Sequence, residues 1–100
     1  MTDGPLNIVA RFQSAPDAQD RLRERLTELI APTRAERGCL SYRLYVAADD
    51  PSALVMVEEW ADLESIAAHN ESEHLRALSA DLPGLVAEPP RITVLQPVQS

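Results

Sequence analysis

The segment ALVMVEEW, residues 53–60, restricts the fold more than any other part of this 100-residue chain. Successive side chains of a β-strand point to opposite faces of a sheet. One face of this strand carries Leu54, Met56, Glu58 and Trp60, and the other carries Val55, Val57 and Glu59. Both faces are largely apolar, which predicts a strand that is covered on both sides.

Similar alternation predicts three more strands. Residues 6–13, LNIVARFQ, place Leu6, Ile8, Ala10 and Phe12 on one face. Residues 39–47, CLSYRLYVA, place Leu40, Tyr42, Leu44 and Val46 on one face. The fourth strand is RITVLQPV, residues 91–98, and the motif DDPS at 49–52 predicts the turn between the second and third strands.

Two helical segments lie between these strands. The first opens at Pro16-Asp17 and is predicted to bury a stripe of residues at helical spacing: Leu22, Leu26, Leu29, Ile30 and Thr33. Pro32 should loosen its last turns, because proline cannot donate a hydrogen bond to the carbonyl four residues back. Gly38 is expected to end this segment.

The second helical segment is predicted to begin after Asp62, a suitable N-cap, and to point Leu63, Ile66 and Ala67 inward. Ser72 can cap a further helical piece that carries Leu75 and Leu78. Pro83-Gly84 should then end it.

The resulting order, β-α-β-β-α-β, predicts an α+β protein of the ferredoxin-like class, with one four-stranded antiparallel sheet and helices on one face. We expect a single domain over residues 6–98 after a flexible N-terminus, residues 1–5. Two helices cover only one face of the sheet, so the other apolar face needs a partner. The simplest partner is the same face of a second copy, in a homodimer.

Composition excludes several classes of function. There are 16 acidic and 9 basic residues and a net charge of −7, which argues against nucleic acid as a partner. No stretch approaches the roughly 20 apolar residues of a membrane span, so no membrane partner is expected. The single cysteine, Cys39, fits a reducing compartment, and we expect a cytoplasmic location.

Four short motifs together resemble one known family. They are ERGCLSY at 36–42, Glu58 and Trp60 in an E-x-W pattern, His69 and His74 in an H-x4-H pattern, and TVLQPV at 93–98. In this order and spacing they are similar to the antibiotic biosynthesis monooxygenase family. The resemblance implies a dimeric ferredoxin-like α+β barrel. It also implies one of three activities: cofactor-independent oxidation of quinols or polycyclic phenols, haem degradation, or isomerisation of small phosphorylated sugars.

Glu58 and His69 are the candidate catalytic residues. An ionised carboxylate on an apolar strand face is costly unless it is paired, so either the pKa of Glu58 is raised or a partner reaches it. His69 follows Ile66 by three residues and should face inward, where we expect it to pair with Glu58 and form one unit that moves protons. The structural alternatives are a hydrogen-bonded carboxylate at a strand end and a core histidine.

Tyr42, Trp60 and His74 are the candidate substrate-binding residues. Tyr42 and Trp60 would line an aromatic pocket, although both side chains also suit a core. His74 lies five residues after His69, which is about 140° around a continuous helix. The two histidines would therefore point apart unless the chain breaks near Ser72.

The sequence predicts neither a metal site nor a cofactor. Two histidines and Glu58 have the composition of a two-histidine, one-carboxylate iron site, but the spacing matches no established zinc or iron motif. Nucleotide-binding glycine motifs are absent. Haem-degrading relatives carry tryptophan, histidine and asparagine where this chain has His69, Ser79 and Phe12, so that branch does not fit.

The leading hypothesis, which the family resemblance implies, is a cofactor-independent monooxygenase that oxidises a quinol or polycyclic phenol with molecular oxygen, with the substrate supplying the electrons. An isomerase of a small sugar-derived metabolite is one alternative. A non-catalytic dimeric ligand-binding module is the other.

Overall fold

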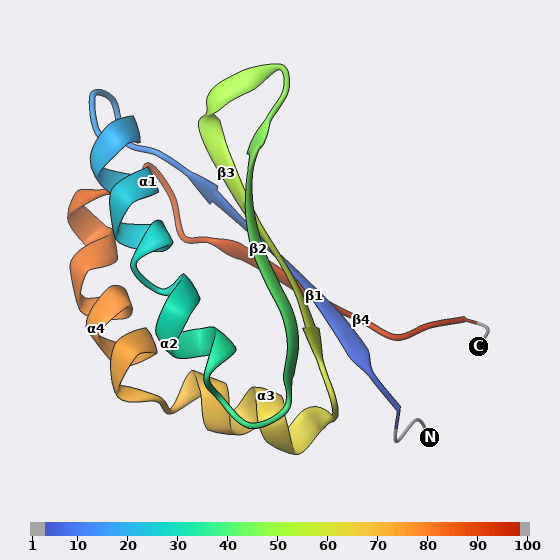
Figure 1. Ribbon diagram of the computed structural model, residues 1–100. Helices are drawn as coiled ribbons and strands as arrows, with labels where there is room; N and C mark the ends of the chain where they lie inside the picture. Colours follow the sequence, from blue (N-terminus) through green and yellow to red (C-terminus); the bar gives the residue numbers. More distant parts are fainter. Residues whose placement is uncertain (1–3, 99–100) are drawn as a thin grey trace.

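The computed structural model describes residues 4–98. The strands are β1 (Leu6–Gln13), β2 (Cys39–Ala47), β3 (Asp50–Trp60) and β4 (Arg91–Leu95). The helices are α1 (Gln19–Thr27), α2 (Ile30–Arg34), α3 (Leu63–Asn70) and α4 (Glu73–Asp81), followed by a 3-10 turn, η1 (Leu82–Gly84). The strands form one antiparallel sheet in the order β2-β3-β1-β4, and the helices lie on one face of it (Figure 1). The predicted ferredoxin-like α+β fold is confirmed.

The first helical segment is divided in two by Pro32. Because proline has no N–H, the carbonyl of Glu28 loses its helical partner, and the break falls between the end of α1 at Thr27 and the start of α2 at Ile30. Helix α1 begins at Gln19, later than predicted, because Asp17 adopts a positive φ of 63°. The predicted buried stripe is otherwise confirmed, with Ile30 half-buried.

Side-chain caps define the second helical segment, as predicted. The Asp62 carboxylate accepts a hydrogen bond from the backbone N–H of Ser65 at 2.8 Å, and the Ser72 hydroxyl accepts one from the N–H of Leu75 at 3.3 Å. Ile66 is buried, but Leu63 and Ala67 are exposed, so the prediction that these two face inward was wrong. Helix α3 lies across one end of the sheet, and only one side of it meets the core (Figure 1).

A bulge in β2 changes which residues face the core. Cys39 pairs with Trp60 and Ser41 pairs with Glu59, the adjacent residue of β3, so Leu40 is the extra residue between them. Leu40 is 53% exposed, and Cys39 instead lies half-buried against the core. The prediction that Leu40 shares the core face of Tyr42 was therefore wrong.

Two predicted boundaries also shift. The turn between β2 and β3 is shorter than residues 49–52, because Ala47 already pairs with Asp50. Strand β3 therefore begins at Asp50, and the Asp50 carboxylate accepts a hydrogen bond from the N–H of Ser52 at 3.0 Å. Strand β4 ends at Leu95, before the predicted residue 98.

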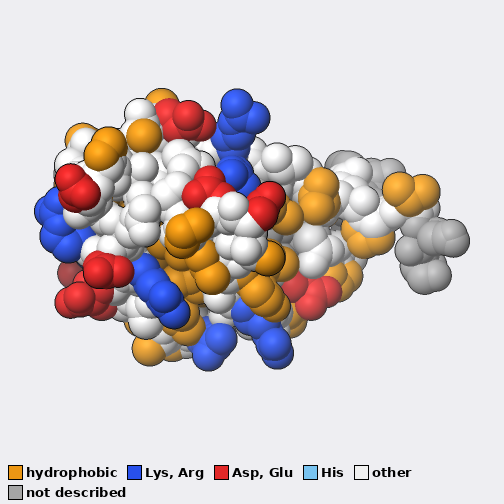
Figure 2. Space-filling view, turned by 90° about the horizontal axis from the view of Figure 1, so that it is seen from above, with side chains coloured by type: hydrophobic (Ala, Val, Ile, Leu, Met, Phe, Trp, Pro, Cys, Tyr) orange, Lys and Arg blue, Asp and Glu red, His pale blue; other side chains and the backbone are white. Residues whose placement is uncertain are grey.

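The core fills the space between the sheet and the helices. Its largest fully buried side chains are Leu6, Leu22, Leu26, Leu29, Thr33, Met56 and Trp60. The opposite face of the sheet exposes Tyr45 and Val57, and every residue of β4 is exposed, including Ile92 and Val94. Seen from above, hydrophobic side chains continue along the arm that carries the chain ends (Figure 2). Within residues 4–98, no helix has the length and apolar character needed to cross a membrane.

Helix α2 ends at Arg34, before the predicted end at Gly38. Gly38 instead fixes the turn that leads from α2 into β2. Its φ is +91°, a backbone conformation that residues other than glycine rarely adopt. A Cβ atom there would lie 2.6 Å from the Cβ of Ser65, and the Ser65 hydroxyl is held by Asp62 at 2.7 Å. The carbonyl of Gly38 also accepts a hydrogen bond from the N–H of Ala61 at 2.8 Å. The turn and the start of α3 are thus packed directly against each other.

Replacing Gly38 by alanine should lower the free energy of unfolding by about 1–3 kcal/mol, because it adds both backbone strain and a clash with Ser65. Gly84 is the matched control, since a Cβ there meets no atom within 4 Å. Urea denaturation of Gly38→Ala and Gly84→Ala tests this difference. Equal stabilities of the two variants would contradict the packing described here.

Candidate functional site

Strand β3 places a carboxyl group and an indole side by side on the covered face of the sheet. Glu58 and Trp60 are two residues apart, so both point towards the helices. Glu58 is 5% exposed and Trp60 is fully buried. The strand neighbours of Glu58 are Ile8 on β1 and Tyr42 on β2. The carboxyl group therefore lies in the core, as the sequence pattern predicted.

Among residues 4–98, one side chain donates a hydrogen bond to this carboxyl group. The indole N–H of Trp60 donates to Oε1 of Glu58 at 2.8 Å. Burial raises the pKa of Glu58 from its usual value near 4.5 to about 7. The hydrogen bond from Trp60 opposes this shift, and the nearby charge of Glu36 adds to it. Glu58 can therefore exchange a proton near neutral pH, which is the property that general acid–base catalysis needs.

The aromatic residues predicted to bind substrate surround the same position. The His69 ring packs on Trp60 with the ring centroids 4.6 Å apart, and it meets Tyr42 edge-on at 5.8 Å. Tyr42 and Trp60 are themselves 6.5 Å apart in an edge-to-face arrangement. The structure thus brings Tyr42, Trp60 and His69 into one cluster with Glu58.

The predicted pairing of Glu58 with His69 was wrong. Nδ1 of His69 lies 2.7 Å from Oε2 of Glu36, while Glu58 bonds to Trp60. Glu36 follows α2 and reaches His69 from the turn that Gly38 makes. Sequence reasoning missed Glu36 as a site residue, and its one indication was its place in the ERGC motif immediately before the glycine.

His74 joins the cluster because α3 and α4 are separate helices. Nε2 of His74 lies 2.7 Å from the same Oε2 of Glu36, and the two histidine rings are 6.1 Å apart. The break at Ser72 removes the 140° offset of a continuous helix, and the Ser72 hydroxyl donates to the His69 carbonyl at 2.7 Å. Glu36 therefore bridges a buried histidine, whose side chain is 4% exposed, and one that is 24% exposed.

Two other titratable groups border the cluster. Burial raises the pKa of the Tyr42 hydroxyl, and the charge of Glu58 raises it further, so this hydroxyl stays protonated at neutral pH. Burial, followed by the charges of Glu36 and Glu58, also raises the pKa of the Cys39 thiol. A nucleophilic cysteine needs the opposite shift, so Cys39 serves packing.

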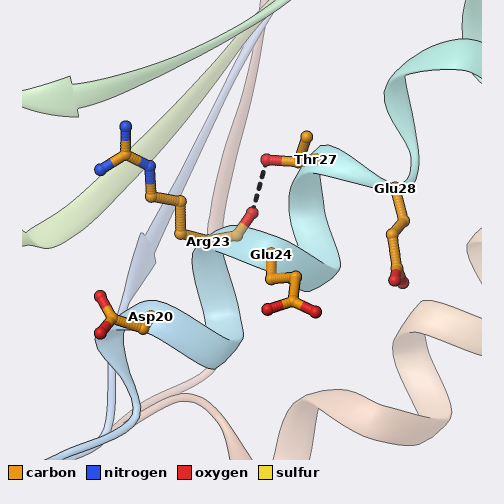
Figure 3. A pocket seen from close by; sticks show the side chains of 5 residues that line it. All are labelled: Asp20, Arg23, Glu24, Thr27 and Glu28. Atoms are coloured by element: carbon orange, nitrogen blue, oxygen red, sulfur yellow. Dashed lines mark hydrogen bonds between the residues drawn. The ribbon is translucent and has the colours of Figure 1, made fainter.

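The cluster is closed in a single chain, since Glu58, Trp60 and His69 are each at most 5% exposed. A separate hollow of about 400 Å³ lies on α1 and is lined by Asp20, Arg23, Glu24, Thr27 and Glu28. Thr27 donates to the carbonyl of Arg23 (Figure 3), and the acidic residues there are exposed. This hollow is a charged, solvated helix surface without the buried acid–base groups of the cluster.

A family profile described as "Antibiotic biosynthesis monooxygenase" matches residues 5–81. The chain belongs to the antibiotic biosynthesis monooxygenase family. Among curated relatives of this family member, "Putative monooxygenase Rv0793" of Mycobacterium tuberculosis is 39% identical, over 94% of this chain and 92% of the relative. "Probable quinol monooxygenase YgiN" of Escherichia coli is 26% identical, over 92% of this chain and 97% of the relative.

Two solved structures of other proteins superpose closely on this chain. PA3566 of Pseudomonas aeruginosa gives a TM-score of 0.91 at 30% identity and covers 99% of both chains. Rv0793 of Mycobacterium tuberculosis gives 0.91 at 38% identity, with 97% of this chain and 98% of that chain covered. The family fold thus extends over nearly the whole chain.

The raised pKa of Glu58 predicts a pH-dependent stability of this family member. Between pH 4.5 and about 7 the folded state holds a proton that the unfolded chain has released. Raising the pH through this window therefore lowers the free energy of unfolding, by up to about 3 kcal/mol in total, and the loss persists above pH 7.

Glu58→Gln is the matched control, because glutamine is neutral at every pH and its oxygen still accepts from Trp60. Urea denaturation of both proteins from pH 4.5 to 8 should show wild type losing stability relative to the variant. A constant difference between the two across that range would mean that Glu58 is not protonated in the fold.

Proposed function

We propose that this protein is a cofactor-independent monooxygenase that oxidises a quinol or polycyclic phenol with molecular oxygen. The carrying observation is the buried Glu58 carboxyl group, with a pKa of about 7, beside the aromatic cluster of Tyr42, Trp60 and His69. Such a carboxyl group can accept a proton from a bound phenol, and aromatic side chains suit a planar aromatic substrate. Membership of the family supports the oxygenase class.

In this proposal the substrate provides the electrons. Glu58 removes a phenolic proton, and the resulting electron-rich anion reacts with oxygen. One oxygen atom enters the ring and the other leaves as water, so that a quinol becomes a hydroxyquinone without an external reductant. The protein contributes the proton acceptor and a site that excludes water.

His69 and Glu36 form the second part of the proposed machinery. The Glu36 carboxylate orients the imidazole through Nδ1 and leaves Nε2 as the ring nitrogen that can accept or return a proton. This is the usual arrangement in which a carboxylate fixes the tautomer of a working histidine. His74, Tyr42 and Trp60 remain the proposed substrate-binding residues.

Charge at the cluster favours a phenol over a phosphorylated sugar. The charge of Glu36 already raises the pKa of Glu58, so two acidic groups act on the same small volume. A phosphate group would add further negative charge there, at a cost that grows in a low-dielectric interior. This argues against the isomerase alternative.

A substrate reaches Glu58 only if the side chains around it move, because the cluster is shielded in the single chain. The segment that covers it is held by short caps at Asp62 and Ser72, and the break between α3 and α4 offers a place for movement. A cluster that never opened would instead suit a non-catalytic module. Activity measurements distinguish an enzyme from such a module.

Glu58→Gln should lower the rate of quinol-dependent oxygen uptake by about 100-fold or more, the usual worth of a general base, while the fold and the bond to Trp60 are kept. The measurement uses an oxygen electrode, 1,4-naphthohydroquinone and dithranol as substrates, and a chelator in the buffer. The uncatalysed autoxidation rate is subtracted.

Glu59→Gln is the control, because Glu59 is the next residue of β3 and faces the other side of the sheet. It should retain wild-type rates. Equal activity of Glu58→Gln and wild type would remove Glu58 from the mechanism. A wild-type protein without activity on either substrate would refute the proposed reaction with these substrate classes and favour the ligand-binding module.

We also propose that two copies associate through the open faces of their sheets. Tyr45 is 50% exposed and Val57 is 37% exposed on that face, and neither is covered by the helices of its own chain. A closed two-fold dimer would bury both side chains on each copy. This arrangement supports the dimeric barrel that the family resemblance implies.

Light scattering at micromolar concentration should give about twice the 11.0 kDa mass of one chain. Val57→Glu should shift the protein to the monomer, because it would bury a carboxylate in the interface. Leu63→Glu is the control, since Leu63 is 54% exposed on α3, away from the sheet face. A folded wild-type monomer, or a Val57→Glu dimer as tight as the control, would contradict the proposed interface.

A further inference from the structure

We propose that Glu36, His69 and His74 form a binding site for a divalent transition metal ion of the zinc class. The three side chains offer one carboxylate oxygen and two imidazole nitrogens, all within 4.8 Å of one another. Neither the family profile nor the names of the relatives assign such a site. The inference concerns metal binding and does not depend on the proposed oxygenase reaction.

The donor set suits the ion chemically. Imidazole nitrogen and carboxylate oxygen are common ligands of Zn²⁺, and sites with three protein ligands keep a fourth position for water. Two histidines and one carboxylate also bind other divalent transition metals. Sequence spacing gave no indication of this set, because the carboxylate comes from Glu36, 33 residues before His69, and not from Glu58.

The distances suit the ion as well. Both imidazole nitrogens lie 2.7 Å from Oε2 of Glu36. Donors at about 2.1 Å from one tetrahedral zinc ion lie about 3.4 Å from each other. Small rotations of the three side chains would therefore separate the donors enough to admit an ion. The two imidazole nitrogens and the carboxylate oxygen would then each bind the ion in place of the two hydrogen bonds.

The donors are held in place before an ion arrives, which lowers the entropy cost of binding. Trp60 packs against the His69 ring at 4.6 Å, and the cap at Ser72 sets the start of the helix that carries His74. Glu36 lies in the turn fixed by Gly38. The side chain of His74 is 24% exposed, so an ion can approach from its side.

Electrostatics also favour a cation. The chain carries a net charge of −7, and Glu58 is close enough to Glu36 for the two carboxyl groups to interact. A divalent ion at Glu36 would relieve this repulsion. The hydrogen bonds to Glu36 satisfy the three side chains without an ion. A direct binding measurement distinguishes a metal site from a hydrogen-bonded cluster that binds no metal.

Isothermal titration of Zn²⁺ into protein without an affinity tag should give one ion per chain, with a dissociation constant below about 10 µM. Glu36→Gln and His74→Asn should each weaken binding by about 10-fold or more, since each removes a ligand. Both positions have some solvent exposure, so both variants should fold, which circular dichroism checks. Co²⁺ provides a second measurement, because its visible absorption reports the ligands directly.

Glu73→Gln is the matched control: Glu73 is exposed, precedes His74 and is outside the donor set. It should bind zinc as wild type does, and its Co²⁺ spectrum should be unchanged. Absence of saturable zinc binding by wild type would overturn the proposal. Binding that is equally tight in wild type, Glu36→Gln and His74→Asn would also overturn it, because the ion would then lie elsewhere.

Discussion

The burial of one carboxyl group, that of Glu58, is the constraint on which the proposed site depends. Strand alternation forces this residue onto the same face as Met56 and Trp60, and its neighbours on the adjoining strands are Ile8 and Tyr42. In such surroundings a charge is costly, and the hydrogen bond from Trp60 offsets only part of the cost. The group is therefore held near its titration point at neutral pH, which a packing role alone would not require.

From Glu58 the contacts continue outward as a chain. Trp60 bonds to Glu58 and packs on His69, and Glu36 connects His69 with the more exposed His74. Glu58 and Trp60 share β3, but His69, Glu36 and His74 come from α3, the turn after α2 and α4, so the arrangement exists only in the folded protein. The buried proton site is thereby connected, through ring contacts and hydrogen bonds, to a side chain that meets solvent.

The fold was predictable because its determinants are local. Alternating strands, the caps at Asp62 and Ser72 and the positive φ at Gly38 each depend on a few neighbouring residues, and all of them appear in the structure. The bulge at Leu40 was not predictable, because it arises from pairing with β3 and leaves no mark in the alternation of β2.

The site was predictable only in part, because some of its contacts join segments that are distant in the sequence. Glu58, His69, Tyr42 and Trp60 were recognised from strand and helix faces together with the family resemblance, and the structure brings them together. The partner of His69 was not recognised, since Glu36 lies in a turn, where no periodicity indicates the direction of a side chain. Pairing between such distant segments is a property of tertiary structure.

The central claim is that Glu58 is protonated in the folded protein close to neutral pH. The most direct test is a titration of the side-chain carboxyl carbon by ¹³C NMR, with the resonance assigned by its absence from Glu58→Gln. The account predicts a midpoint near pH 7. A midpoint near the usual value of about 4.5 would show that the carboxyl group is ionised in the fold, and would contradict the account.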